Sequence, residues 1–314
     1  MRVAVVGAGL SGLAAARELA TGGHEVVVFE KSRGMGGRLA SRRAEGTVLD
    51  HGSPVVAAPP GCALRALIDD LGADDRIDLG DGIAFSSGAT RLPKLMAAGL
   101  DVRLGIRVAA LRPASGGFEV GDEQGNTHGV VDAVVVSAPA PQAADLLERS
   151  PEAGPRVAAL RAVAYAPAVI ILLGLRTDAE ASWEPLDDLG APIGGARRES
   201  AKGRPPTGGV EPVVVRLAAG ASAELLDASD AAVLARALPA LAARLGPAAG
   251  EPAWAQVKRW RFAVPEAPGD AAAINPPGAR IVVAGDALTG AAFGSADHHR
   301  VYDSGVAAAR RVSA

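Results

Sequence analysis

A glycine-rich stretch near the amino terminus has the residue types and spacing of a phosphate-binding turn. Gly7, Gly9 and Gly12 form the pattern G-x-G-x-x-G, with Leu10 and Ser11 inside it. In this pattern the first glycine makes a tight turn, the second lets a pyrophosphate approach the backbone, and the third lets a helix pack closely on a strand. Free N–H groups at the start of the helix bind the phosphates. The stretch is therefore predicted to bind a dinucleotide.

A carboxylate stands where a ribose ligand is expected. Glu30 follows the apolar run Glu25–Phe29, eighteen residues after Gly12. A carboxylate at this point accepts hydrogen bonds from both ribose hydroxyls and repels a 2′-phosphate. We predict that Glu30 binds an unphosphorylated ribose, with Lys31 beside it.

A second group of phosphate-binding residues follows directly. Gly36 and Gly37 bring backbone amides toward a pyrophosphate, and Arg38 adds a permanent cation that donates two N–H groups to one phosphate. A simple nicotinamide dehydrogenase has no use for this second clamp, Gly36–Arg38. The clamp resembles the G-G-R element that follows the ribose-binding Glu in the flavin amine oxidase superfamily. The resemblance implies that the cofactor is FAD.

Three segments near the carboxyl end resemble bacterial renalase-like proteins of that superfamily. Lys258–Pro265 is similar to their W-R-[YF]-A-x-P segment, and Ala284–Asp286 to their A-G-D. The resemblance implies that Gly285 and Asp286 bind the ribityl–phosphate region of FAD. Ser304-Gly305 is similar to the S-G that starts the last helix of these proteins, whose N-terminus faces the flavin.

The resemblance also implies flavin contacts in less similar parts of the chain. The backbone of Val108 would contact the adenine, and Gly52, Ser53 and Phe293 would lie at the flavin. The ring-side segment, Asp50–Ala57, departs from the family pattern D-x-G-A-Q-[YF]-F-T because it has neither the Gln nor the aromatic residues. Residues 294–300 read as an insertion close to the flavin. The sequence thus keeps the family's cofactor residues better than its substrate residues.

The function implied is removal of a hydride from a small substrate, with dioxygen as the candidate acceptor. Renalases act in this way on misreduced nicotinamide dinucleotides. Trp260 and Phe262, with Tyr302, are candidates for an apolar substrate wall, or are ordinary core residues. No catalytic base is assigned, because the flavin itself accepts the hydride.

Three other functions stay open. The chain could be an amine oxidase or a desaturase of a biosynthetic pathway, although ten aromatic residues in all leave few for an amine cage. It could be a non-catalytic flavin-binding protein, which the altered ring-side segment favours. A plain nicotinamide dehydrogenase is the remaining alternative.

Apolar periodicity predicts the elements that position these residues. A turn at 124–126 joins two strands of a meander, and alternate residues of the strand 254–262 share one face: Trp254, Gln256, Lys258, Trp260 and Phe262. Gly22-Gly23 ends the first helix. The predicted strands are 3–6, 25–29, 101–108, 118–120, 130–136, 168–173, 212–217, 254–262 and 280–284, and the predicted helices are 13–20, 140–149, 156–163, 231–245 and 305–309.

These elements predict an α/β fold with two domains. The first is a Rossmann-like FAD-binding domain of three layers with a β-meander, formed by residues 1–56, 96–141 and 276–314. The second is a smaller, interleaved α+β substrate domain, formed by residues 57–95 and 142–275. Proline and glycine gather at 185–212, which predicts a long loop or lid.

Composition narrows the function further. A net charge of −3 argues against nucleic-acid binding, and the basic residues of 197–204 read as a solvated loop rather than an anion site. Cys62 is the only cysteine, and the adjacent His298 and His299 point apart, so no metal site is expected. No apolar run is long enough to span a bilayer. We expect a cytoplasmic monomer or homodimer with a small-molecule substrate.

Overall fold

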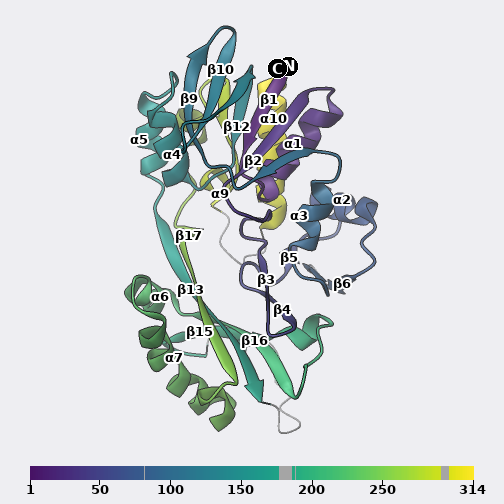
Figure 1. The fold of residues 1–314 in the computed structure, drawn as a ribbon, viewed down its shortest axis with the longest axis vertical. Helices are drawn as coiled ribbons and strands as arrows, with labels where there is room; N and C mark the ends of the chain where they lie inside the picture. Colours follow the sequence, from purple (N-terminus) through teal and green to yellow (C-terminus); the bar gives the residue numbers. More distant parts are fainter. Residues whose placement is uncertain (81, 177–185, 188, 291–296) are drawn as a thin grey trace.

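Five parallel strands form the sheet that carries the glycine-rich turn in the computed structural model (Figure 1). The structure describes residues 1–80, 82–176, 186–187, 189–290 and 297–314. The strand order is β18-β12-β1-β2-β8. The bounds are β1 Arg2–Val6, β2 Glu25–Glu30, β8 Asp101–Leu104, β12 Ala133–Val136 and β18 Ile281–Val283.

Both faces of this sheet are apolar, as its β-branched sequence requires. Val3 and Val5 of β1 pack on one face against α1 (Leu10–Thr21) and α10 (His298–Ser313). Ala4 packs on the other face, with a β-meander and two helices. The meander consists of β9 Val108–Ala114, β10 Gly117–Asp122 and β11 Thr127–Val131, and the helices are α4 Ala140–Glu148 and α5 Pro155–Arg161. The predicted three-layer Rossmann-like arrangement is confirmed.

Two strands predicted in this region are each divided in two. The single strand expected over 101–108 ends at Leu104, because Gly105 takes a positive φ of 73° and the chain turns there. The N–H of Gly105 donates to the carbonyl of Ser32. The strand expected over 130–136 is interrupted at Asp132, whose carboxylate accepts the N–H of Arg2 at 2.7 Å. The predicted turn at 124–126 joins β10 to β11.

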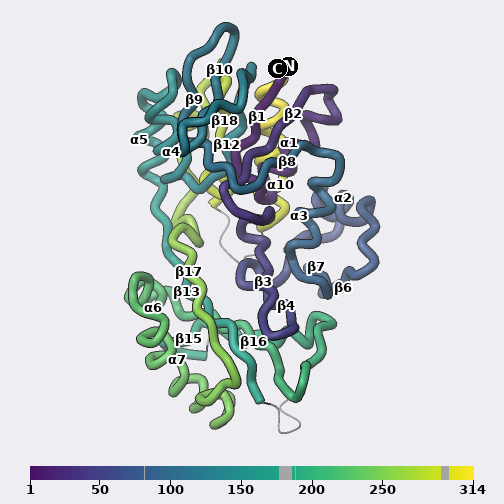
Figure 2. The backbone as a smooth tube through the Cα atoms, in the orientation of Figure 1, coloured from purple at the N-terminus to yellow at the C-terminus, as the bar shows by residue number. Residues whose placement is uncertain are grey.

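A second, antiparallel sheet forms the lower lobe in Figures 1 and 2, with the order β14-β15-β16-β13-β17. One face is covered by helices α6 and α7, which bury Val169, Ile171 and Val257. The other face buries Ile170 and Leu172. The bounds are β13 Tyr165–Arg176, β14 Leu186–Asp187, β15 Ile193–Arg198, β16 Val210–Leu217, β17 Trp254–Pro265, α6 Ala219–Leu225 and α7 Asp230–Leu245.

A two-stranded hairpin reaches from the upper lobe onto the second face of this sheet (Figure 1). It consists of β3 (Ser41–Ala44) and β4 (Thr47–Asp50). Ala44 and Leu49 of the hairpin are buried in the same apolar cluster as Ile170, Leu172 and Trp260. The hairpin therefore fixes the ring-side segment, which begins at its last residue, between the two lobes.

The remaining elements complete the upper lobe and the connections. A small sheet and two helices, α2 and α3, share the apolar core of α1. Their bounds are β5 Val56–Ala57, β6 Arg76–Leu79, β7 Gly82–Phe85, α2 Ala63–Leu71 and α3 Arg91–Met96, and the short helices elsewhere are η1 Glu199–Lys202, η2 Pro247–Gly250, α8 Ala271–Ile274 and α9 Asp286–Thr289.

The loop or lid predicted over 185–212 is wrong for most of its length. Ile193–Arg198 forms β15, which pairs with β16, and η1 follows it directly. Pairing with β16 supplies backbone partners that the local sequence does not reveal, so the proline and glycine content was misleading. The other predicted helices and strands have counterparts close to their expected bounds, except in the last helix.

The apolar clusters bear on the predicted division into domains, which stays a prediction. Residues of α4 and α5 are buried together with the parallel sheet, and those of α2 with α1. The prediction assigned α2, α5 and all but the first two residues of α4 to the substrate domain. Within the described ranges, no helix has the length and apolar character needed to cross a membrane.

Candidate functional site

The glycine-rich turn connects β1 to α1 as predicted. Gly7 has a φ of 105°, and a Cβ on Gly12 would lie 2.0 Å from the carbonyl oxygen of Gly7, so neither position accepts a side chain. A Cβ on Gly9 would meet nothing within 4 Å. Gly9 is also the N-cap of α1. Because glycine has no side chain, no side-chain hydrogen bond caps this helix. The backbone N–H groups at the start of α1 therefore have no side-chain cap, and the backbone at Gly9 borders open space.

Glu30 lies at the end of β2 and is almost fully buried. One carboxylate oxygen accepts the N–H of Ala8 at 2.9 Å and the other accepts the N–H of Ser32 at 2.8 Å. Each oxygen keeps a further lone pair for a ligand hydroxyl. Lys31 is exposed and donates to Gln142 at 2.7 Å. Val108, at the start of β9, is buried in the cluster that contains Phe29.

The clamp lies against the glycine-rich turn. Gly36 donates its N–H to the carbonyl of Ala8 at 2.8 Å, and Gly9 and Gly36 form a parallel bridge. Gly36 and Gly37 both have positive φ, at 121° and 54°. The two predicted phosphate-binding segments thus form one surface of backbone groups.

Arg38 joins this surface to the carboxyl-terminal motif. Its guanidinium lies 2.5 Å from a carboxylate oxygen of Asp286 and donates to the carbonyl of Ala263 at 3.3 Å. Although burial opposes it, the Asp286 charge raises the pKa of Arg38. Burial and Asp286 also raise the pKa of Tyr165, so this phenol stays protonated. The clamp, the A-G-D motif and β17 therefore meet at one point.

The last helix differs from the prediction. Ser304-Gly305 was expected to start it, but α10 begins at His298, so these residues lie in mid-helix. Ser304 Oγ accepts the N–H of Gly285 at 3.0 Å. A Cβ on Gly305 would lie 2.1 Å from the carbonyl oxygen of Ser11, so this glycine lets α10 pack on α1. Phe293 and the first three residues of the predicted insertion, 294–296, lie outside the described residues, whereas 298–300 form the first turn of α10.

The ring-side segment is bonded to the clamp through its backbone. Ser53 donates its N–H to the carbonyl of Arg38 at 2.8 Å, and Gly52 donates to that of Ala40 at 3.1 Å. A Cβ on Gly52 would lie 2.0 Å from the carbonyl oxygen of Arg38, so only glycine fits. The position of this segment therefore depends directly on that of the clamp.

His51 in this segment stacks on Trp260 of β17. The ring centroids are 5.5 Å apart at 23°, and Trp260 Nε1 donates to the carbonyl of His51 at 2.8 Å. Burial, followed by the charge of Lys258, lowers the pKa of His51 to about 4, so the imidazole is neutral at pH 7. Phe262 contacts Tyr165 edge-on at 5.8 Å. Tyr302, by contrast, packs against the core around α1.

A cluster of four buried ionisable residues includes Asp50, the first residue of the ring-side segment. We call Asp50, Glu199, Lys202 and Arg204 the buried ion cluster; each is at most 4% exposed. Asp50 accepts from Lys202 and Arg204, both at 2.8 Å, and Glu199 pairs with the same two cations. Although burial opposes it, these cations hold the pKa of Asp50 below its usual value.

The buried ion cluster corrects the sequence interpretation of 197–204 as a solvated loop. Two of its basic residues, Lys202 and Arg204, are instead buried against Asp50, more than 150 positions away in the chain. Arg197 pairs at the surface with Asp187. The only sequence signal for the cluster is that Lys202 and Arg204 lie near Glu199. Their other partner, Asp50, is too distant in sequence to be predicted.

His298 is the second half-buried histidine near the clamp. Its Nδ1 accepts the N–H of Ala57 at 3.1 Å, and burial followed by the charge of Arg38 lowers its pKa to about 4. Cys62 caps α2 by accepting the N–H of Arg65 at 3.3 Å. In the part of the chain that the structure describes, no three His, Cys, Asp or Glu residues gather as a metal site.

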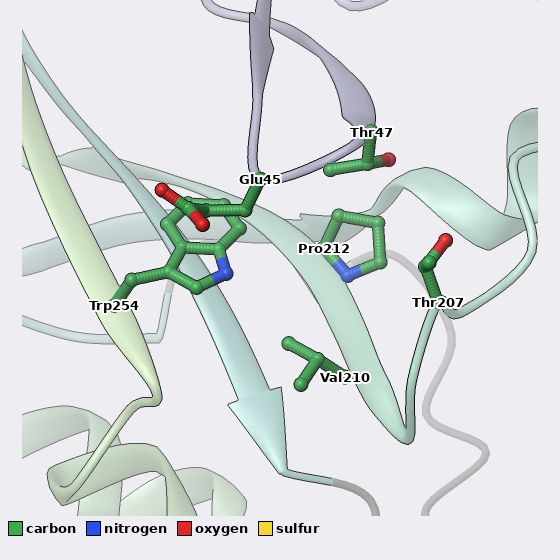
Figure 3. A pocket seen from close by; sticks show the side chains of 6 residues that line it. All are labelled: Glu45, Thr47, Thr207, Val210, Pro212 and Trp254. Atoms are coloured by element: carbon green, nitrogen blue, oxygen red, sulfur yellow. The ribbon is translucent and has the colours of Figure 1, made fainter.

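A surface hollow lies away from these residues, between the turn of the β3–β4 hairpin and the lower sheet (Figure 3). The hairpin turn is at the end opposite the ring-side segment. The hollow therefore plays no part in the predicted cofactor site. It is lined by Glu45, Thr47, Thr207, Val210, Pro212 and Trp254.

Comparison with protein families decides the class to which this site belongs. Residues 77–313, three quarters of the chain, match the family described as flavin containing amine oxidoreductase. This chain belongs to the flavin containing amine oxidoreductase family. Residues 5–71 also match an NAD(P)-binding Rossmann-like domain. The protein is accordingly an FAD-dependent oxidoreductase.

Solved structures of amine oxidases share the fold over the whole chain. A putrescine oxidase bound to putrescine superimposes with a TM-score of 0.78 at 16% identity, covering 100% of this chain and 99% of that one. Cyclohexylamine oxidase from Brevibacterium oxydans IH-35A gives a TM-score of 0.73 at 14% identity, covering 99% and 98%. At such low identities these similarities show the fold alone.

Curated relatives match over a short region. The 4,4′-diapophytoene desaturase of Staphylococcus haemolyticus is 40% identical over 81 residues, which are 25% of this chain and 16% of that protein. The desaturase of the same name from Staphylococcus aureus strain Newman is 46% identical over 59 residues, or 19% and 12%. The chain thus spans less than a fifth of the length of either relative.

The residues in the predicted cofactor site fit FAD. The uncapped start of α1 and the open space at Gly9 suit a pyrophosphate, the clamp provides amides and a cation for it, and the remaining lone pairs of Glu30 suit a ribose. A flavin bound there supplies a two-electron acceptor for a hydride. Backbone N–H groups of the glycine-rich turn and the clamp, together with Arg38, would hold the phosphates, and Glu30 would hold the ribose. Which residues bind each part of FAD stays a prediction.

Proposed function

We propose that this flavin-containing amine oxidoreductase removes a hydride from a dihydronicotinamide, in the manner of renalase-like proteins, with dioxygen as the acceptor. The observation that carries the proposal is the position of the segment Lys258–Pro265. Its Ala263 carbonyl accepts a hydrogen bond from Arg38 at 3.3 Å, and its Trp260 stacks on His51 of the ring-side segment. The segment that resembles renalases therefore lies directly beside the predicted cofactor residues.

The protonation states of nearby groups support a reaction without a protein base. His51 and His298 have pKa values of about 4, so both are weak bases at pH 7. The pKa of Tyr165 is raised by burial and by Asp286, so the phenol does not ionise. Oxidation of a dihydronicotinamide requires only loss of a hydride, because the aromatic pyridinium forms without loss of a proton from the ring.

Oxidation of an amine, or desaturation, is the second candidate function. The family match favours amine oxidation, and the partial match to the diapophytoene desaturases favours desaturation. An amine oxidase binds a cationic substrate, for which stacked aromatic rings form a cage. Here the rings beside the clamp are Trp260, Tyr165 and Phe262, and Phe262 meets Tyr165 edge-on rather than parallel to it.

Anaerobic reduction of the purified holoprotein tests the proposal. We expect a dihydronicotinamide isomer to bleach the flavin absorbance and air to restore it, whereas primary amines leave the flavin oxidised. Free FAD at the same concentration is the control for direct reduction. Bleaching by a primary amine but by no dihydronicotinamide would establish the second candidate function. Bleaching by neither would contradict dihydronicotinamide oxidation and amine oxidation, and would leave desaturation.

A further inference from the structure

Two cationic residues lie near the Trp260–His51 stack, the exposed Arg42 and the half-buried Lys258. Arg42 of β3 pairs across the hairpin with Leu49. Because directly paired residues point to the same face of a hairpin, Arg42 shares the face of Leu49, which is buried against the lower sheet beside Trp260. Lys258 is two residues before Trp260 on β17, so their side chains share one face of that strand.

The charges of these groups lie close enough to affect one another. Burial, followed by the positive charge of Arg42, lowers the pKa of Lys258, and only Asp230 opposes this. Burial, Lys258 and Arg42 together lower the pKa of His51, against the charge of Asp50. The two cations therefore lie near each other and near a neutral imidazole.

Neither cation has a carboxylate partner among the residues that the structure describes. The ion pairs there place no Asp or Glu oxygen within 4.0 Å of Arg42 or Lys258, and Asp230 pairs with Arg259 instead. Two buried polar atoms next to them, His51 Nδ1 and Gln256 Oε1, also have no hydrogen-bond partner. Gln256 lies on the same face of β17 as Lys258. Buried polar groups in this state cost free energy unless a ligand binds them.

We propose that Arg42 and Lys258, with His51 and Gln256, form a subsite that binds a phosphate group of the substrate. The proposal rests on the proposed dihydronicotinamide oxidation and names the substrate class more closely: a dihydronicotinamide nucleotide rather than the free riboside. Two unpaired cations attract an anion and lower the local concentration of cationic amines. They give no advantage to an apolar hydrocarbon. The amide of Gln256, turned about its last bond, donates to the same phosphate.

Direct binding tests the subsite without any turnover. We would titrate oxidised holoprotein with inorganic pyrophosphate by calorimetry, because bound FAD already fills the predicted cofactor site. Arg42→Gln and Lys258→Gln should each weaken pyrophosphate binding at least tenfold. Arg43→Gln is the matched control: Arg42 and Arg43 are both exposed, but Arg43 pairs with Val48 on the other face of the hairpin. Equal affinity in wild type and all three variants, or no binding to wild type, would overturn the proposal.

Flavin reduction provides the second measurement. With dihydronicotinamide mononucleotide, Arg42→Gln and Lys258→Gln should raise the KM at least tenfold, while with the uncharged dihydronicotinamide riboside they should leave it unchanged. Equal effects on both compounds would contradict a phosphate subsite. If pyrophosphate binds as expected but neither compound reduces the flavin, the subsite stands and the proposed function fails. Thermal unfolding and FAD content of each variant show that the fold is intact.

Discussion

The two halves of the predicted site are built from different parts of the chain. In the nucleotide half, backbone groups make the surface: the glycine-rich turn and the clamp lie together as peptide units, without side chains between them. In the substrate half, side chains make the surface, with His51, Trp260 and Lys258 drawn from distant segments. A backbone surface follows from local glycine spacing, whereas a side-chain surface depends on how distant segments pack.

The halves also differ in how their charges are balanced. Arg38 is paired with Asp286, and Glu30 accepts two backbone amides. In the substrate half the paired charges are those of the buried ion cluster. Arg42 and Lys258 have no carboxylate partner among the described residues. In our proposal, charge in the first half binds FAD and charge in the second half selects the substrate.

The largest expected effect is the loss of folding stability when the buried ion cluster, which binds the substrate half, is broken. Arg204→Met should lower the free energy of unfolding by about 3–5 kcal/mol, because it leaves the buried carboxylates of Asp50 and Glu199 with one cation between them. Arg197→Met is the control and should cost less than about 1 kcal/mol, since its pair with Asp187 is at the surface. Urea unfolding of both variants measures the difference. Similar losses in the two would show that the cluster does not hold the substrate half.

The second effect depends on pH and involves both halves. His51 and His298 have folded pKa values of about 4 against an ordinary value of 6.5. The unfolded chain therefore binds protons first as the pH falls, and stability is full above pH 6.5 and decreases down to pH 4. The loss should be about 3 kcal/mol per histidine, at about 1.4 kcal/mol per pH unit.

His298→Gln tests this assignment, because glutamine keeps an acceptor for the N–H of Ala57 but does not titrate. Urea unfolding at pH 7.5 and 4.5 should show a smaller loss of stability in this variant than in wild type. Staying above pH 4 limits the contribution of Asp50, whose lowered pKa removes stability only at lower pH. An unchanged pH dependence would mean that His298 is protonated in the folded protein.

The smallest of the three effects concerns the nucleotide half. Arg38→Ala should weaken FAD binding by about 1.5–3 kcal/mol, the usual value of a charge-assisted hydrogen bond. Arg33→Ala should leave it unchanged, because Arg33 is exposed ahead of the clamp. Fluorescence titration of apoprotein with FAD measures both. The double variant with Asp286→Asn separates loss of the phosphate contact from the cost of an unpaired Asp286, and equal FAD affinity of the two single variants would refute the assignment.

Sequence patterns were informative where geometry is local. The run from β1 through α1 to β2 follows from three glycines and a β-branched pattern, and α7 and β17 follow from apolar periodicity alone. The G-G-R motif indicated the clamp, because positive φ angles at Gly36 and Gly37 are a property of those residues themselves. The fold class could be derived from these elements.

Patterns failed where a distant partner decides the structure. β15 forms because β16 pairs with it, and Arg204 is buried because Asp50 receives it. Ser304-Gly305 suggested a helix start, but Gly305 is needed for packing on Ser11, which can happen at any point in a helix. The His51–Trp260 stack joins residues more than 200 positions apart, and no local signal predicted it.

The two long strands β13 and β17 determine how the lobes can move against each other. Each has 12 residues, and together they run as one ribbon from the upper lobe to the far end of the lower sheet (Figure 2). At about 3.3 Å per residue the ribbon is about 40 Å long. Because the two strands are hydrogen-bonded to each other, the ribbon can bend, but it cannot rotate about its length as freely as a single-stranded linker. Its register shifts between Ala166 and Ala168, beside Phe262. We expect opening of the substrate half to occur as bending at this point, which carries Trp260 away from Arg38.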